Sequence, residues 1–301
     1  MGKKNISTKI EAFYKNQSEH HKRDKKSTKE LKEIWSQETV DFWRHERMRN
    51  SLLPLIERFP KSNWLTIGDG KYGTEANFLK RKGLKVHASD IQTSLLKIGK
   101  REGFIEDFSL QNAEDLSFND NSFDFVYCKE SYHHFPRPAI AVYEMLRVAK
   151  KGIILQEPVD RLFFENMIQA IFFKILEPLR KLIRSKKSIH KFEESGNYVY
   201  TLSPRELQKY ALGLGYRCIA YKIQQDYYKK GMEEEKCTET SKLFKNSKRR
   251  IYLLESLYKF GLPVGGIITG VILKEVPHKY LIKDLKKDGF KVEILPQNPY
   301  L

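Results

Sequence analysis

Cysteine and long apolar runs are scarce in this 301-residue chain. The three cysteines, Cys128, Cys218 and Cys237, show no CxxC spacing, which argues against a zinc site or a disulfide framework. No run approaches the roughly 20 apolar residues of a membrane-spanning helix. The lysine-rich first 32 residues lack the apolar stretch of a secretory signal. We therefore expect a cytoplasmic protein that folds without a metal ion.

Acidic residues are outnumbered, with 38 Asp and Glu against 55 Lys and Arg and a net charge of +17. Residues 61–158 carry 14 basic and 13 acidic side chains, whereas residues 159–301 carry 27 and 16. Basic flanks suit an anionic partner such as a phosphate, an acidic sugar, a lipid headgroup or a nucleic acid. A solubilising surface is an equally good interpretation of this charge.

Alternating patterns in the middle of the chain predict a parallel sheet. Short apolar runs alternate with amphipathic stretches of about 10 to 15 residues, which is typical of βαβ units. The runs are Trp64–Ile67, Leu84–Ala88, Phe123–Cys128 and Ile153–Leu155. We therefore predict an α/β protein with a Rossmann-like core.

The patterns divide the chain into four parts. Residues 1–60, with no glycine or proline between Gly2 and Pro54, are predicted to form an N-terminal helical extension or cap. Residues 61–158 form the core, and residues 159–202 form a helical insertion that acts as a lid. Residues 203–301 complete the sheet and extend it, with Val264–Leu273 as a central strand and a polar, mobile loop with helical parts over residues 227–250.

A glycine-rich turn follows the first predicted strand. Gly68, Asp69, Gly70 and Gly73 let the backbone bend sharply and approach a ligand, and the helix expected to follow offers unpaired N–H groups. Asp90 lies 22 positions after Gly68, at the end of the second predicted strand, where a carboxylate can accept hydrogen bonds from both ribose hydroxyls. These residues predict an adenosine-type cofactor and do not separate NAD from S-adenosylmethionine.

A later passage distinguishes the two cofactors. Residues 111–118 read Gln-Asn-Ala-Glu-Asp-Leu-Ser-Phe, followed by Ser-Phe-Asp-Phe-Val at 122–126 and Tyr-His-His-Phe at 132–135. With this passage the chain resembles the class I S-adenosylmethionine-dependent methyltransferases of the type 11 group. The resemblance covers about residues 63–158. It implies S-adenosylmethionine as the cofactor and a parallel-sheet methyltransferase fold whose last strand is antiparallel.

The resemblance also implies roles for individual residues. Asp90 would hold the ribose diol, and Asn112 and its neighbours would frame the adenine. Two positions depart from the family, because Thr66 stands where an acidic residue is usual and Tyr72 stands where the third glycine is expected. Both departures indicate an altered loop and raise the alternative of a non-enzymatic binding protein. The residues assigned to the cofactor are Gly68, Asp69, Gly70, Asp90, Asn112, Ala113, Glu114 and Lys129.

His133 and His134 are the candidate catalytic residues. If the methyl acceptor is a hydroxyl, a neutral imidazole can remove its proton near physiological pH. In the family that the chain resembles, a histidine pair at this point also occurs simply as the start of a helix. Both interpretations are open at this stage.

The favoured function is O-methylation of a small molecule or glycan, which the basic flanks would suit if the acceptor is anionic. The alternatives are an RNA methyltransferase that uses the basic flanks and an NAD-dependent oxidoreductase built on the glycine turn. A predicted helix from Leu162 to Ile183 has an apolar face and a basic end. It is interpreted as a lid over the acceptor, with a dimer contact or a peripheral membrane contact through residues 162–187 as alternatives. The sequence leaves the oligomeric state open.

Overall fold

The computed structural model describes residues 11–12, 14–16, 38–160, 163, 167, 169–171, 174–175, 191–193, 197–262 and 266–300. Most of the predicted helix Leu162–Ile183, and with it most of the predicted lid, lies outside the described residues. The same is true of most of the first 37 residues. None of the described helices is both long and apolar enough to cross a membrane.

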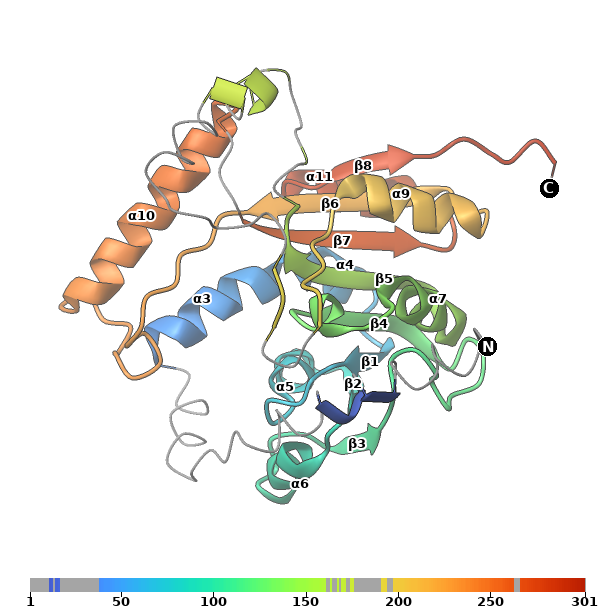
Figure 1. Cartoon of the computed structure of the whole chain (residues 1–301), viewed down its shortest axis with the longest axis horizontal. Helices are drawn as coiled ribbons and strands as arrows, with labels where there is room; N and C mark the ends of the chain where they lie inside the picture. The colour runs from blue at the N-terminus through green and yellow to red at the C-terminus, as the bar shows by residue number, and fades with distance from the viewer. Residues whose placement is uncertain are drawn as a thin grey trace.

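One eight-stranded sheet runs through the molecule in the order β3-β2-β1-β4-β5-β7-β6-β8 (Figure 1). Strands β1 to β5 pair in parallel, and β7 runs antiparallel to both of its neighbours, β5 and β6. The edge strand β8 is antiparallel to β6. The predicted fold class is therefore confirmed. The strands are β1 (Asn63–Ile67), β2 (Lys85–Asp90), β3 (Asp107–Leu110), β4 (Phe123–Lys129), β5 (Ala149–Pro158), β6 (Cys218–Gln224), β7 (Ile267–Leu273) and β8 (Lys291–Ile294).

Helices cover both faces of the sheet and bury its apolar side chains. Residues of α7 and α9 pack in one core cluster, and residues of α4, α5, α6 and α11 pack in a second cluster. Strands buried on both sides need continuous apolar runs, which explains why β7 is fully buried. The described helices are α3 (Val40–Arg49), α4 (Leu53–Arg58), α5 (Thr74–Arg81), α6 (Ser94–Arg101), α7 (Pro138–Val148), α9 (Pro204–Gly213), α10 (Lys242–Lys259) and α11 (Lys279–Lys287).

A smaller hydrophobic cluster, separate from the two that cover the sheet, joins α3 to α10. Val40 of α3, Phe244 of α10 and Met232 of the loop before α10 are buried together. The Trp43 ring meets the Phe244 ring edge-on at 5.1 Å between centroids. In Figure 1, α10 projects to one side of the sheet and α3 lies between α10 and the strands. Helix α3 therefore links the projecting helix to the carboxyl edge of the sheet.

The structure differs from the local predictions in two places. The strand β3 was missed because Asp107–Leu110 is short, partly exposed and not an apolar run. The segment over residues 227–250, predicted as a mobile loop with helical parts, is a loop as far as Ser241, whose side chain accepts a hydrogen bond from the Phe244 N–H and starts α10. Helix α10 is held by Phe244, which packs against Val40 of α3 and Met232 of the preceding loop, contacts that the polar composition did not reveal.

Candidate active site

The glycine turn lies between β1 and α5, as predicted. Gly68 has a φ of +71°, and a Cβ there would lie 2.3 Å from the Ser131 Cβ. The Ser131 hydroxyl donates to the Gly68 carbonyl oxygen at 2.8 Å. Because Ser131 lies two residues after the end of β4, the glycine turn is in contact with the loop that carries His133 and His134. Only a residue without a Cβ fits this contact.

Asp69 is almost fully buried beneath the turn. Its carboxylate accepts hydrogen bonds from the Thr66 hydroxyl at 2.9 Å and from the Glu75 and Ala76 N–H groups at 3.1 and 2.8 Å. Burial, with the nearby charge of Glu75, raises the pKa of Asp69 to about 7. The carboxylate of Asp69 thus binds the free N–H groups at the N-terminus of α5. It also accepts the hydrogen bond of Thr66, the residue that stands where the family usually has an acidic side chain. Its predicted contact with the cofactor stays a prediction.

Asp90 is at the end of β2 and faces the same turn. Its side chain accepts a hydrogen bond from the Gln92 N–H at 2.7 Å, and the Gly70 N–H also bonds to it. Burial raises the pKa of Asp90 to about 6. A Cβ at Gly70 would lie 2.7 Å from one Asp90 carboxylate oxygen. The glycine therefore keeps the backbone beside a carboxylate that is held ready to accept further hydrogen bonds.

We expect Gly70→Ala to weaken binding of S-adenosylhomocysteine by about tenfold, because the new methyl group displaces the Asp90 carboxylate and one charge-assisted hydrogen bond is lost. Isothermal titration measures the change. Gly213→Ala is the control, because Gly213 lies in α9 without a positive φ, and a Cβ there meets the end of a side chain, the Tyr143 hydroxyl, at 3.2 Å. Equal affinity in the wild type and Gly70→Ala would contradict the role given to this turn.

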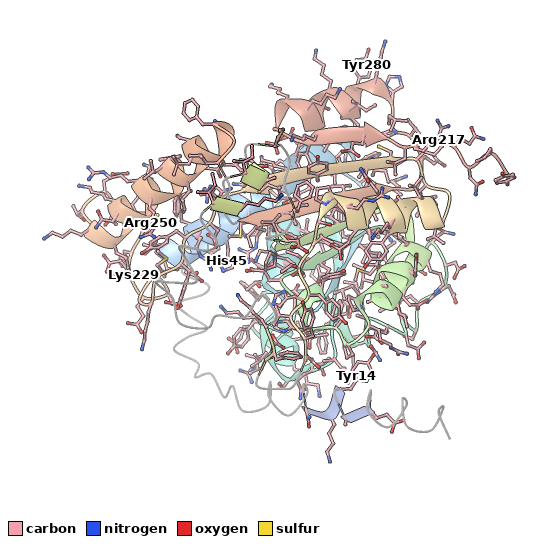
Figure 2. The ribbon with its side chains drawn as sticks, turned by 45° about the horizontal axis from the view of Figure 1, so that its top comes forward. Tyr14, His45, Arg217, Lys229, Arg250 and Tyr280 are labelled. Carbon is pink, nitrogen blue, oxygen red and sulfur yellow. The ribbon has the colours of Figure 1, made fainter. Side chains whose placement is uncertain are left out.

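The residues predicted to frame the adenine form one group after β3. The Asn112 side chain accepts from the Glu114 N–H at 3.0 Å. The Glu114 carboxylate accepts from the N–H and the Nε of Arg137, both at 2.6 Å. Tyr14, labelled in Figure 2, lies against Asn112, Glu114 and Arg137, and burial beside Glu114 raises its pKa to about 12. A tyrosine from the N-terminal segment, which the sequence analysis did not identify, therefore covers this group. Ala113 is buried in the core beside it.

Lys129 belongs to a buried network of charges at the end of β4. Its amine bonds to the Glu130 carboxylate and lies 2.8 Å from the His45 Nδ1. Burial together with the charge of Lys129 lowers the pKa of His45 well below its usual value, so this imidazole is neutral. Burial alone would raise the pKa of Glu130, but Lys129 outweighs burial and lowers it to about 2. The predicted role of Lys129 at the cofactor stays a prediction.

Arg49 of α3 and Glu75 of α5 extend this network. Their side chains form a bidentate ion pair with both N···O distances at 2.8 Å, and both side chains are buried. A buried pair of this kind holds its elements in one arrangement because losing either partner leaves an unpaired charge. The network therefore fixes α3 across the carboxyl edge of the sheet, next to the glycine turn.

His133 has the partner that a general base needs. Its Nδ1 lies 2.6 Å from a carboxylate oxygen of Glu157, which is completely buried at the end of β5. The other Glu157 oxygen accepts from the Ser131 and Tyr132 N–H groups at 2.8 and 2.9 Å. Because an ionised carboxylate only accepts, Nδ1 carries the proton and Nε2 is free to accept another. Burial alone would lower the pKa of His133, but Glu157 outweighs burial and raises it.

His134 has a different setting. Its Nδ1 lies 2.5 Å from a carboxylate oxygen of Glu193, which is partly exposed. Ligand atoms of His133, His134 and Glu193 all lie within 4.8 Å of one another, so this group could also hold a divalent metal ion. Of the two candidate bases, His133 alone is oriented by a fully buried carboxylate.

These residues lie together where open α/β sheets bind their ligands, outside the carboxyl ends of the strands. A family model described as a methyltransferase domain matches residues 65–155. Residues 65–155 are a class I S-adenosylmethionine-dependent methyltransferase domain. The predicted family and cofactor are confirmed. The site of the domain fits S-adenosylmethionine, because Gly70 leaves the backbone bare beside Asp90 and the Asp90 carboxylate is oriented by two N–H groups.

Known proteins resemble this chain over part of its length. The demethylmenaquinone methyltransferase of Renibacterium salmoninarum is 35% identical over 106 residues, which are 35% of this chain and 44% of that protein. The ubiquinone/menaquinone biosynthesis C-methyltransferase UbiE of Rhizobium meliloti is 32% identical over 131 residues, or 40% of this chain and 51% of that protein. The chain thus spans about half the length of these relatives. Among solved structures, the YcgJ protein of Bacillus subtilis has a TM-score of 0.45 at 20% identity, covering 76% of this chain and 99% of that chain.

Three residues of the methyltransferase domain site were missed by sequence reasoning. Tyr14 and His45 come from the N-terminal extension, and no local pattern marks them as site residues. Glu157 carried a signal, because an acidic residue follows the apolar run of β5 at its carboxyl end. A charged residue in a buried strand needs a partner or a function.

Proposed function

We propose that the protein uses S-adenosylmethionine to methylate a hydroxyl group of a small molecule or glycan. The observation that carries the proposal is the pair of His133 and Glu157. His133 lies on the loop after β4, which is bonded to the glycine turn through Ser131, and Glu157 lies near the end of β5. A base in this place suits an acceptor whose proton has to be removed during the transfer.

The chain's own residues have three tasks in this reaction. Asp90 and the glycine turn hold the cofactor, which when bound supplies a methyl group already activated by a sulfonium. His133 accepts the proton of the acceptor hydroxyl at Nε2. Glu157 keeps the imidazole in the correct tautomer and stabilises the imidazolium that results. Alignment of the acceptor and exclusion of water supply much of the remaining rate.

Aromatic side chains next to the histidines support a sugar-like acceptor. The ring of Phe192 is 70% exposed and meets the ring of Tyr198 edge-on at 5.6 Å, and Tyr198 meets Tyr200 in the same way at 5.1 Å. The segment is tied to the catalytic loop, because the Asn197 side chain donates to the His134 carbonyl oxygen at 2.9 Å. Exposed aromatic rings offer a flat apolar surface on which a sugar ring can stack.

A second candidate is methylation of a ring carbon in a quinol. One relative named above is called a demethylmenaquinone methyltransferase, and UbiE is called a ubiquinone/menaquinone biosynthesis C-methyltransferase. The same base would serve, because removing the proton of a phenolic hydroxyl makes the ring carbons more nucleophilic. Since residues 65–155 match a methyltransferase domain, an NAD-dependent oxidoreductase is not supported.

Two measurements test the proposal. S-adenosylhomocysteine at about 100 times its dissociation constant should stabilise the protein by about 2.7 kcal/mol in a thermal shift assay, and NAD should have no effect. Incubation with methyl-labelled S-adenosylmethionine and panels of glycosides and quinols should then label a hydroxyl oxygen. Label on a ring carbon would favour the second candidate, and stabilisation by NAD alone would overturn both.

A further inference from the structure

Helix α10 exposes a basic face along most of its length. Its 18 residues contain six Lys and Arg but one acidic residue, Glu255. That carboxylate is turned toward the protein, where it accepts from the Gln225 N–H at 2.8 Å and pairs with Arg47 at 3.5 Å. The exposed face therefore carries no acidic residue. Its exposed basic residues are Lys242, Lys245, Arg249, Arg250 and Lys259.

Large apolar side chains lie on the same face, toward the C-terminal end of the helix. Tyr252 is 56% exposed, Leu253 is 59% exposed, and Phe260, which follows the helix, is 80% exposed. With helical spacing, Arg249, Tyr252, Leu253 and Phe260 share one stripe. These three large apolar side chains on one helix belong to none of the described core clusters. Solubility alone gives no reason for such a group on the surface.

A second segment adds to this apolar surface. Met167, Ile171 and Ile175 are exposed, and Lys174 beside them is exposed as well. Figures 1 and 2 both place this yellow-green segment beside the C-terminal end of α10. Two segments about 80 positions apart in the sequence thus present apolar and basic side chains on one side of the molecule. We call the exposed face of α10 and this segment the α10 surface.

We propose that the α10 surface docks on an anionic lipid bilayer. The Lys and Arg side chains complement the negative headgroups, while Phe260, Leu253 and the neighbouring apolar side chains enter the interface. Basic residues alone would suit any polyanion. The large exposed apolar residues within the basic surface favour a bilayer over a nucleic acid, because base-stacking surfaces use aromatic rings in a polar groove rather than aliphatic side chains.

Docking through α10 would bring the active site close to the bilayer. Helix α10 holds α3 through the Trp43–Phe244 contact and the Arg47–Glu255 pair. Helix α3 reaches the end of β4 through His45 and Lys129, 2.8 Å apart. Given the proposed function, this arrangement suits an acceptor that is carried on a lipid or is itself amphipathic.

Sedimentation of the full chain with vesicles tests the docking. We expect binding to phosphatidylcholine vesicles that contain phosphatidylglycerol, weaker binding at high salt, and little binding to phosphatidylcholine alone. The double variant Arg249→Glu/Lys259→Glu should lower the partition coefficient by about tenfold or more. The double variant Leu253→Ser/Phe260→Ser should lower it as well. Lys97→Glu/Arg101→Glu on α6 is the control of equal charge and should bind like the wild type.

Several results would overturn the proposal. The first is that the protein does not bind vesicles. The second is that both charge-reversed variants lose the same amount of vesicle binding, and the third is that Leu253→Ser/Phe260→Ser binds vesicles like the wild type. If single-stranded RNA binds, depends on Arg249 and Lys259 but not on Leu253 and Phe260, and competes with vesicles, then the α10 surface is a polyanion site. The assay needs neither cofactor nor acceptor, so its outcome is independent of the proposed function.

Discussion

Asp90→Ala is expected to weaken binding of S-adenosylhomocysteine by about 100-fold or more. The Asp90 carboxylate is already oriented by the N–H groups of Gln92 and Gly70, and it is proposed to accept hydrogen bonds from both ribose hydroxyls. Two hydrogen bonds to a charged group contribute about 3 kcal/mol or more together, which corresponds to about 100-fold in affinity. Isothermal titration measures the loss. Asp107→Asn, at the exposed edge strand β3, is the control and should bind normally.

The same carboxylate predicts how binding depends on pH. Because burial raises the pKa of Asp90 to about 6, the charged acceptor is fully present only above that pH. The affinity for S-adenosylhomocysteine should therefore fall as the pH is lowered through about 6, and the pH dependence should be absent in Asp90→Ala. The affinity is measured between pH 5 and pH 8, which lie about one unit or more on either side of this pKa. A constant affinity over this range would mean that the ribose binds elsewhere.

His133→Ala is expected to lower kcat by about 100- to 10,000-fold, the usual contribution of a general base, while the affinity for S-adenosylhomocysteine stays unchanged. His134→Ala is the matched control, because that imidazole bonds to the partly exposed Glu193. It should lose far less activity. A chelator should not lower the rate, because the proposed chemistry needs no metal ion. A larger loss in His134→Ala, or inactivation by the chelator, would contradict the assignment of His133 as the base.

The pH profile gives a second test of the same pair. His133 accepts a proton only when neutral, so kcat should fall as the pH drops through its pKa. Glu157 raises that pKa above the ordinary value for histidine. In Glu157→Gln the charge is removed, so the acidic limb of the profile should move to lower pH, and the plateau rate should fall because the imidazole is less well oriented. An unchanged acidic limb would mean that another group titrates.

Much of the fold could be predicted because its signals are local. An apolar run such as Trp64–Ile67 is buried on both faces in any parallel sheet, and β1 forms there. Serine is a residue type that commonly caps helices, and Ser203 forms a complete capping box with Glu206 at the start of α9. Prediction was incomplete where the deciding contact was distant. Strand β3 was missed because it depends on pairing with β2, and the length of α10 did not follow from its polar composition because its apolar contact is with Trp43 of α3.

The sequence by itself determined the α/β class, the glycine turn and the place of Asp90, because each depends on residues close together in the chain, and the resemblance of residues 111–135 to the methyltransferases indicated the cofactor. Tertiary structure decided the partners. Only the folded chain brings His45 to Lys129, 84 positions away, and Glu157 to His133, 24 positions away. Sequence patterns report periodicity and turn chemistry within one element, whereas a buried ion pair depends on how separate elements pack, so the choice between His133 and His134 required the structure.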